Sequence, residues 1–141
     1  MKKNVLILGS TGSIGKSTLE VIDNNDNFNV VSLVANNQKD LLLEQANKFN
    51  ASNVYLSNES FSSAEQSKHL NLNLFKDLDA LIDDKDIEIV VAAISGLIGV
   101  DSILKAIQAG KKILIANKEP IVVAGKILMS EAKKSGAEII P

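Results

Sequence analysis

The amino-acid sequence predicts an α/β fold in which a doubly wound, mostly parallel sheet carries helices on both faces. Short runs of branched aliphatic residues without polar alternation, as strands buried on both faces require, alternate with stretches of helical apolar spacing. A glycine-rich segment follows the first of these runs directly. Such alternation, with short connections between elements, is typical of a parallel sheet wound in two directions.

Length and composition fit one domain over residues 1–141. The chain is 45% hydrophobic and 23% charged, which excludes a disordered chain. With 15 Lys+Arg against 17 Asp+Glu it has no basic footprint for nucleic acid, and without cysteine it has no disulfide or thiolate site. The longest apolar run, residues 89–94, is far shorter than the ~20 residues of a membrane span. We therefore expect a cytoplasmic protein without nucleic-acid or membrane partners.

In the first half of the chain, residues 5–8 and 30–35 predict buried strands, each followed by a helix. The first helix ends near residue 24, and the second covers residues 42–49. Recurrence of apolar residues every three or four positions predicts their inward faces. These are Ile14, Thr18, Val21 and Ile22 in the first helix, and Leu42, Gln45, Ala46 and Phe49 in the second.

A short third strand is expected over residues 53–56, followed by a polar, serine-rich stretch with a short helix and loops at residues 57–70. Leucines at 70, 72 and 74 alternate with asparagines, which predicts a short strand at the edge of the sheet. Residues 89–93 are the most apolar strand candidate and are expected at the centre of the sheet.

The last third of the chain repeats the alternation. Val100, Ile103, Leu104 and Ile107 predict a helix that Gly110 closes, and a strand follows at residues 113–115. Pro120 suits the first turn of a further helix, which ends at Gly136 before a last strand begins at residue 138. The predicted inward face of that helix holds Ile127, Leu128 and Ala132.

The strongest local motif is the segment GSTGSIG at residues 9–15, between the first strand and the first helix. Gly9 permits a tight turn, Gly12 lets the backbone approach a pyrophosphate, and Gly15 lets the helix pack close to the sheet. The free N–H groups and positive dipole end of the helix then bind phosphate, as in Rossmann-like domains. A P-loop is excluded because Gly9 lies one position too far from Gly15 and Lys16.

The residues after the second strand bear on the choice of cofactor. NAD-binding folds commonly place an acidic residue there to bind the ribose 2′-hydroxyl. This chain has Asn36, Asn37, Gln38 and Lys39, with no carboxylate before Asp40. The amides and the lysine suit a 2′-phosphate, so NADPH is favoured over NADH, although an ordinary polar loop explains each single residue equally well.

Two further segments follow predicted strands. Residues 94–99 (ISGLIG) supply small residues where a cofactor needs room. Asn117, Lys118 and Glu119 follow the strand at residues 113–115, where a lysine can bind a substrate anion and its neighbours a cofactor. Taken alone, packing explains the first segment and a charged helix start explains the second.

Together, residues 9–15, 92–99 and 116–122 resemble the 1-deoxy-D-xylulose 5-phosphate reductoisomerase family, in the same order and at similar separations. The likeness runs from residue 5 to residue 141. It implies an NADPH-dependent oxidoreductase of non-mevalonate isoprene biosynthesis that uses Mg or Mn and forms a homodimer when full length. The reaction it implies rearranges 1-deoxy-D-xylulose 5-phosphate and reduces the aldehyde formed to 2-C-methyl-D-erythritol 4-phosphate.

The resemblance also implies roles for individual residues. Phosphate binding is expected near the start of the first helix, adenosine binding after the second strand, and nicotinamide contact at Asn117 and Glu119, while Lys118 reaches the phosphosugar substrate. The full set of expected cofactor-binding residues is Gly9, Thr11, Gly12, Ser13, Ile14, Gly15, Asn36, Asn37, Gln38, Ala93, Ile94, Asn117 and Glu119.

In the family, residues 139–141 lead into a Val-Asp-Ser-Glu run that binds the metal, then a catalytic domain and a C-terminal helical domain. We therefore expect residues 1–141 to be an NADPH-binding domain that holds cofactor without turnover and contains no catalytic or metal-binding residue. Two alternatives stay open: a non-catalytic dinucleotide-binding or redox-sensing module, and the N-terminal domain of another two-domain NADP-dependent reductase. Against the sensor, the Asn-Lys-Glu block supplies a substrate-anion lysine that a sensor does not need.

Overall fold

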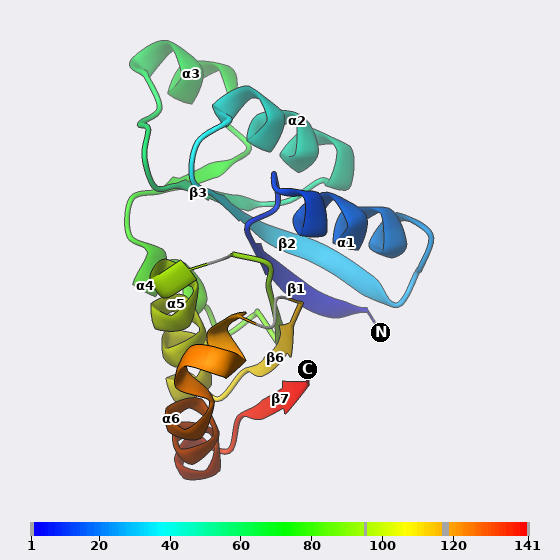
Figure 1. Cartoon of the computed structure of the whole chain (residues 1–141). Coiled ribbons are helices and arrows are strands. Elements are labelled where there is room, and N and C mark those ends of the chain that lie inside the picture. The colour runs from blue at the N-terminus through cyan, green and yellow to red at the C-terminus, as the bar shows by residue number, and fades with distance from the viewer. Residues whose placement is uncertain (1, 95, 117–118, 141) are drawn as a thin grey trace.

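The computed structural model describes residues 2–94, 96–116 and 119–140, and in these it contains seven strands and six helices in near-perfect alternation (Figure 1). Each predicted strand is present, and no described helix is long and apolar enough to cross a membrane. The strands are β1 (Lys3–Leu8), β2 (Phe28–Ala35), β3 (Asn53–Leu56), β4 (Asn73–Phe75), β5 (Ile89–Ala92), β6 (Lys112–Ile115) and β7 (Glu138–Ile140). The helices are α1 (Ser13–Asp23), α2 (Lys39–Phe49), α3 (Ser63–Lys68), α4 (Leu78–Ile82), α5 (Gly96–Gln108) and α6 (Glu119–Ser135).

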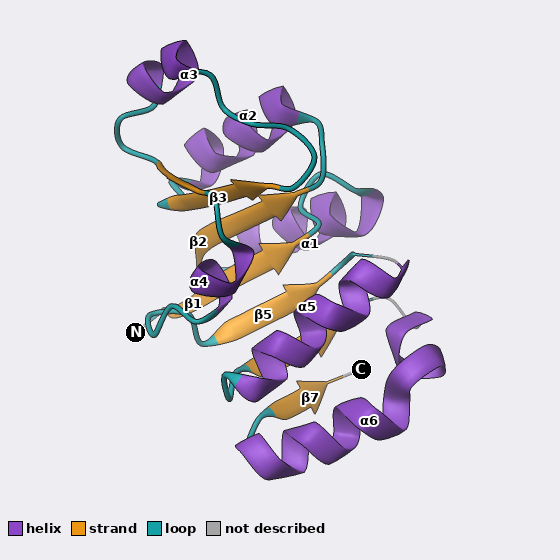
Figure 2. Cartoon of the chain, turned by 90° about the vertical axis from the view of Figure 1, so that its left-hand side faces the viewer, coloured by secondary structure: helices purple, strands orange, loops and turns teal. Residues whose placement is uncertain are grey.

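All seven strands form one parallel sheet in the order β4-β3-β2-β1-β5-β6-β7, and in Figure 2 their arrows point the same way. The chain winds outward from β1 to β4 and then returns to place β5 on the other side of β1. The doubly wound fold predicted from the sequence is therefore confirmed. Strand order reverses between β1 and β5, and ligands of such sheets bind beyond the carboxyl ends of strands at this point.

Two apolar cores lie on opposite faces of the sheet, one under α1 and α2 and the other under α4, α5 and α6 (Figures 1 and 2). Alternate residues of β1 belong to different cores: Val5 and Ile7 face α1 and α2, whereas Leu6 and Leu8 face α5. Because β1 is covered on both sides, its apolar run has no polar alternation.

The predicted inward face of α1 is partly wrong. Gly15 and Leu19 are the buried residues of this helix, whereas Val21 is 66% exposed and Ile14 is 39% exposed. The reason lies at Gly15, where a Cβ would stand 2.1 Å from the Gly9 carbonyl oxygen. This contact turns the side of the helix that carries Gly15 and Leu19 toward the sheet.

The end of the chain and the sheet edge also differ in detail from the prediction. On α6, Leu128 and Ala132 are buried as predicted, but Ile127 is 61% exposed. The edge strand β4 begins at Asn73, three residues later than expected, and Leu70 stands 84% exposed in a turn.

Helix α4 was not predicted at all, because five residues are too few to show helical periodicity. The Asp77 side chain caps its start by accepting a hydrogen bond from the Asp79 N–H at 3.0 Å. The helix buries Leu81 and Ile82 in the core that it shares with α5.

Candidate functional site

The loop that joins β1 to α1, residues 9–12, is termed the glycine loop. Gly9 has a φ of +88°, a conformation that favours glycine, and a Cβ there would also meet the Ala93 carbonyl oxygen at 2.9 Å. The N–H groups of Gly9 and Ser10 both donate to the Val34 carbonyl oxygen, at 2.8 and 3.1 Å. The loop is thus held between the ends of β2 and β5.

Helix α1 starts at this loop without a side-chain cap. Gly12 is its N-cap residue, in an extended conformation, and the first helical bond runs from the Lys16 N–H to the Gly12 carbonyl at 2.9 Å. Within the described residues, the N–H groups of Ser13, Ile14 and Gly15 have no hydrogen-bond partner, and the first turn has no acidic side chain. The positive end of the helix dipole therefore remains available to an external anion.

The glycines of the motif meet very different surroundings. At Gly15 an added Cβ would overlap the backbone of Gly9 and Ser10, so the fold itself requires glycine there. At Gly12 the nearest atom to an added Cβ is the Gly9 carbonyl oxygen at 3.7 Å, an ordinary contact. The fold would therefore tolerate a side chain at position 12. The lack of one leaves open space beside the start of α1, which a ligand could occupy.

A cavity of about 290 Å³, termed the crevice, lies beyond the carboxyl ends of β1, β2 and β5. Eight predicted cofactor-binding residues line it, and five residues that were not predicted complete it. The predicted ones are Gly9, Thr11, Gly12, Asn36, Asn37, Gln38, Ala93 and Ile94, and the others are Val34, Ala35, Tyr55, Ser57 and Leu78.

The remaining predicted site residues do not line the crevice or are not described. Ser13, Ile14 and Gly15 form the first turn of α1, directly after Gly12. Asn117 and Lys118 lie outside the described residues. Glu119 begins α6, and its side chain is likewise outside the description.

The loop after β2 is held by the end of β3. The Asn36 side-chain oxygen accepts a hydrogen bond from the Ser57 hydroxyl, and the Asn36 carbonyl accepts one from the Asn58 N–H at 2.8 Å. Gln38 then takes a left-handed conformation, with a φ of +61°, immediately before α2. These bonds fix the wall of the crevice where the sequence predicts adenosine binding.

Lys39 is occupied elsewhere and does not line the crevice. Its Nζ lies 3.0 Å from the Glu65 carboxylate and 4.0 Å from that of Glu59, and donates to the Ser60 carbonyl at 3.3 Å. The hydrogen bond with Glu65 raises the pKa of Lys39 above its usual value. The expected donation from Lys39 to a 2′-phosphate therefore competes with this ion pair, whereas Asn37 and Gln38 lie at the crevice.

The sequence did not indicate that Gln45 contacts the glycine loop, although it placed this residue on the inward face of a helix. Its Nε2 donates to the Ser10 carbonyl at 3.0 Å, so α2 reaches the glycine loop across 35 positions of sequence. The available signal was a polar glutamine on the otherwise mostly apolar inward face of a helix, because a buried amide needs a hydrogen-bond partner. Tyr55 and Ser57 could have been found from their place at the end of the third strand, whereas Leu78 lies on the unpredicted α4.

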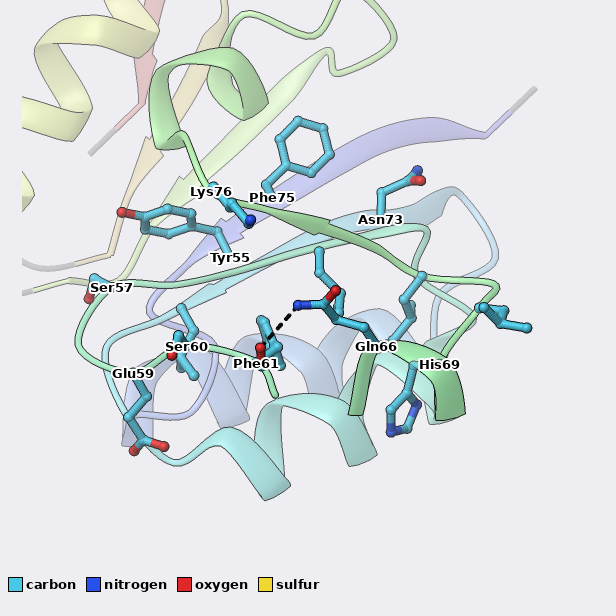
Figure 3. A pocket seen from close by; sticks show the side chains of 14 residues that line it. Tyr55, Ser57, Glu59, Ser60, Phe61, Gln66, His69, Asn73, Phe75 and Lys76 are labelled. Atoms are coloured by element: carbon cyan, nitrogen blue, oxygen red, sulfur yellow. Dashed lines mark hydrogen bonds between the residues drawn. The ribbon is translucent and has the colours of Figure 1, made fainter. Parts of the chain in front are cut away.

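A second cavity of about 620 Å³, termed the edge cavity, lies beside β3 and β4 under the segment at residues 57–72 (Figure 3). Its walls include Tyr55, Phe61 and Phe75, and Gln66 Nε2 donates to the Phe61 carbonyl at 3.0 Å. Tyr55 and Ser57 line both cavities. Although larger, the edge cavity lies at the β3 and β4 edge of the sheet and not at the switch point between β1 and β5, so the topology favours the crevice as the ligand site.

Comparison with known proteins agrees with this geometry. The family model of 1-deoxy-D-xylulose 5-phosphate reductoisomerase matches residues 5–125. The reductoisomerase of Ruthia magnifica subsp. Calyptogena magnifica is 41% identical over 146 residues, which cover 99% of this chain and 38% of that protein. The chain thus spans well under half the length of its curated relatives.

Solved structures show the same fold. A crystal structure of DOX-P reductoisomerase with NADPH, fosmidomycin and magnesium superposes with a TM-score of 0.89 at 35% identity, covering 99% of this chain and 36% of the other. The Zymomonas mobilis enzyme in complex with NADPH gives 0.86 at 31% identity, covering 99% and 38%. With its glycine loop, parallel sheet and matched residues, the chain belongs to the 1-deoxy-D-xylulose 5-phosphate reductoisomerase family.

Proposed function

We propose that this chain is the NADPH-binding domain of a 1-deoxy-D-xylulose 5-phosphate reductoisomerase. The observation that carries the proposal is the uncapped start of α1 behind Gly12, which opens onto a crevice at the topological switch point. Such helix starts bind phosphate groups through free N–H groups and the helix dipole. Related proteins of the same fold have been crystallised with NADPH, which supports this choice of ligand.

The residues at hand fit the parts of the dinucleotide. The diphosphate lies against the glycine loop, where the N–H groups of Ser13 and Ile14 are free and Gly12 leaves room. The adenosine end lies along Asn36, Asn37 and Gln38, and the nicotinamide end reaches toward Ala93 and Ile94. The family resemblance supports Asn117 and Glu119 as further contacts of the nicotinamide end. When bound, NADPH supplies the hydride for reduction of the aldehyde.

For the whole protein we propose the reductoisomerase reaction, in which Lys118 binds the phosphosugar anion. Mg or Mn would serve the rearrangement, but the described residues include no group of three or more acidic or histidine side chains that could hold a metal. We propose that this chain's part is to bind and orient the cofactor. We further propose a cytoplasmic homodimer for the whole protein, as the family resemblance implies.

The first test is titration of the chain with NADPH, with NADH and ATP as comparison ligands. We expect NADPH to bind and the Gly12→Val variant to bind it at least about tenfold more weakly, because the new side chain occupies the place of the diphosphate. The same variant should lose only about 1 kcal/mol of stability, the usual cost of a poorer N-cap. Isothermal calorimetry and urea denaturation measure the two quantities.

Ala64→Val is the matched control, since it adds similar bulk at an exposed site on α3 that lines neither cavity. It should bind NADPH like the parent chain. Equal affinity of the parent and the Gly12→Val variant would refute the proposed diphosphate site. Tighter binding of ATP than of NADPH would instead favour a mononucleotide site.

A further inference from the structure

The side chain of Gln45 holds the glycine loop by a hydrogen bond, although Gln45 does not line the crevice. Gln45 of α2 is only 8% exposed, and its Nε2 donates to the Ser10 carbonyl at 3.0 Å. Ser10 is fully buried, whereas its neighbour Thr11 lines the crevice. The contact therefore joins the inner side of the loop to a helix that packs on β2 and β3.

The direction of the Ser10 carbonyl fixes the direction of the next amide. In a planar trans peptide, the C=O of one residue and the N–H of the next point in opposite directions. With the Ser10 carbonyl directed at Gln45, the Thr11 N–H points away from α2. Within the described residues this N–H has no hydrogen-bond partner.

Stability alone does not explain a glutamine at this position. Its second polar atom, Oε1, is buried without a partner in the described residues, as is the Ser10 hydroxyl. A buried polar atom without a partner destabilises a fold, so an arrangement chosen for stability would satisfy both ends of the amide or use none. The hydrogen bond to the Ser10 carbonyl is therefore the contact that explains a glutamine at position 45.

We propose that Gln45 is a positioning residue for the cofactor: it orients the peptide between Ser10 and Thr11 so that the Thr11 N–H is presented to the diphosphate. This inference rests on the proposed function, since it assigns a further amide to the same diphosphate site. Gln45 acts through the loop and touches no ligand itself.

The test compares Gln45→Met with Ser32→Ala in the 141-residue chain. Gln45→Met keeps the size of the side chain but removes the donor, and we expect about tenfold weaker NADPH binding. Ser32→Ala removes the 3.0 Å buried hydrogen bond from Asn53 Nδ2, at a distance from the crevice. It should lower stability comparably and leave NADPH affinity within about twofold of the parent.

Gln45→Glu supplies a rescue that a merely structural role would not show. A protonated carboxyl group can donate to the Ser10 carbonyl, whereas a carboxylate cannot. The affinity of this variant, relative to the parent, should therefore recover as the pH falls from about 8 to about 5, since burial raises the pKa of a carboxyl group. Lys16, Glu20, Glu44 and Lys48 line the surface around position 45 in both proteins, so the parent chain measured at each pH is the control for these charged neighbours.

An amide spectrum of the ligand-free chain separates this inference from the proposed function. The Thr11 resonance should shift in Gln45→Met and stay in place in Ser32→Ala, whether or not NADPH is present. Unchanged NADPH affinity together with an unchanged Thr11 resonance in Gln45→Met would overturn the role of Gln45 and leave the proposed function intact. Failure of the parent chain to bind NADPH would overturn the proposed function, whatever the Thr11 resonance does.

Discussion

At the scale of single residues, the glycine motif combines two kinds of requirement that a sequence cannot separate. Gly9 and Gly15 are required by the fold, one by a positive φ and one by backbone contact, whereas at Gly12 the fold leaves room for a side chain and the proposed diphosphate site needs that room. The spacing of the motif was readable from the sequence, but these surroundings arise from tertiary contact. Substitution at each position therefore tests a different property.

Replacement of Gly15 by alanine should be strongly destabilising. Alanine normally favours a helix by about 1 kcal/mol over glycine, but here its Cβ would stand 2.1 Å from a backbone oxygen that no rotamer change can move away. Overpacking of this kind costs roughly 3 kcal/mol, so the clash outweighs the propensity. Urea denaturation measures the difference, and Gly12→Ala, expected within about 1 kcal/mol of the parent, is the control. A Gly15→Ala variant as stable as the parent would mean that α1 can move off the loop.

At the scale of elements, the sequence predicted most of the strands well, misjudged one face of α1 and missed the short helix α4. Residues 53–56 were assigned to a strand with the same bounds as β3, and β5 lies at the centre of the sheet as expected. Helix α4 escaped prediction because it is defined by the Asp77 cap and by burial against α5, neither of which is a periodic signal. The inward face of α1 was misjudged because contact with the glycine loop, not apolar spacing, orients that helix.

Residues 59–68, which contribute to the lining of the edge cavity, should become less stably folded in acid. The pKa of Glu65 is lowered to about 2, first by the Ser62 N–H in the capping box of α3 and then by Lys39. Because this pKa lies below the ordinary value of 4.5, the contribution of the carboxylate is complete above about pH 4.5 and is lost as the pH falls toward 2. The hydrogen-exchange protection factors of the α3 amides, which correct for the pH dependence of intrinsic exchange, should therefore fall over this range. In Glu65→Gln they should be lower at neutral pH and respond less to acid. The same pH response in Glu65→Gln would assign the effect to another group.

At the scale of the whole molecule, three motifs in order predicted the family, and the alternation of strands and helices predicted the doubly wound sheet, but neither predicted the shape of the crevice. Tyr55, Ser57 and Leu78 come from elements far from the glycine segment, and only the strand order β3-β2-β1-β5 brings them together. Gln45 likewise contacts Ser10 because α2 packs beside α1 on one face of the sheet. Local sequence patterns indicate which loops are candidates for ligand binding. Tertiary packing determines which distant side chains complete the cavity beside those loops.

Binding of NADPH should stabilise the molecule as a unit. At a free concentration of about 100 times the Kd, a ligand that binds only the folded state adds about 2.7 kcal/mol. For a chain of this size that corresponds to a rise in Tm of roughly 10 °C. A thermal scan with NADPH, and with ATP at the same concentration, checks this, and protection by ATP without protection by NADPH would contradict the dinucleotide assignment.

The central position of β1 has a consequence for how the chain finds its correct strand alignment. Since both faces of β1 are apolar, sliding it by one residue would exchange its two sets of side chains without exposing any to water, so hydrophobicity discriminates weakly against the slip. Discrimination must come from the strand's ends, where Asn4 bonds to the Asp86 carbonyl and Gly9 to that of Val34. The turn at Gly9 thus also helps to set the register of β1, and substitutions at Gly9 are expected to impair folding as well as the proposed phosphate binding.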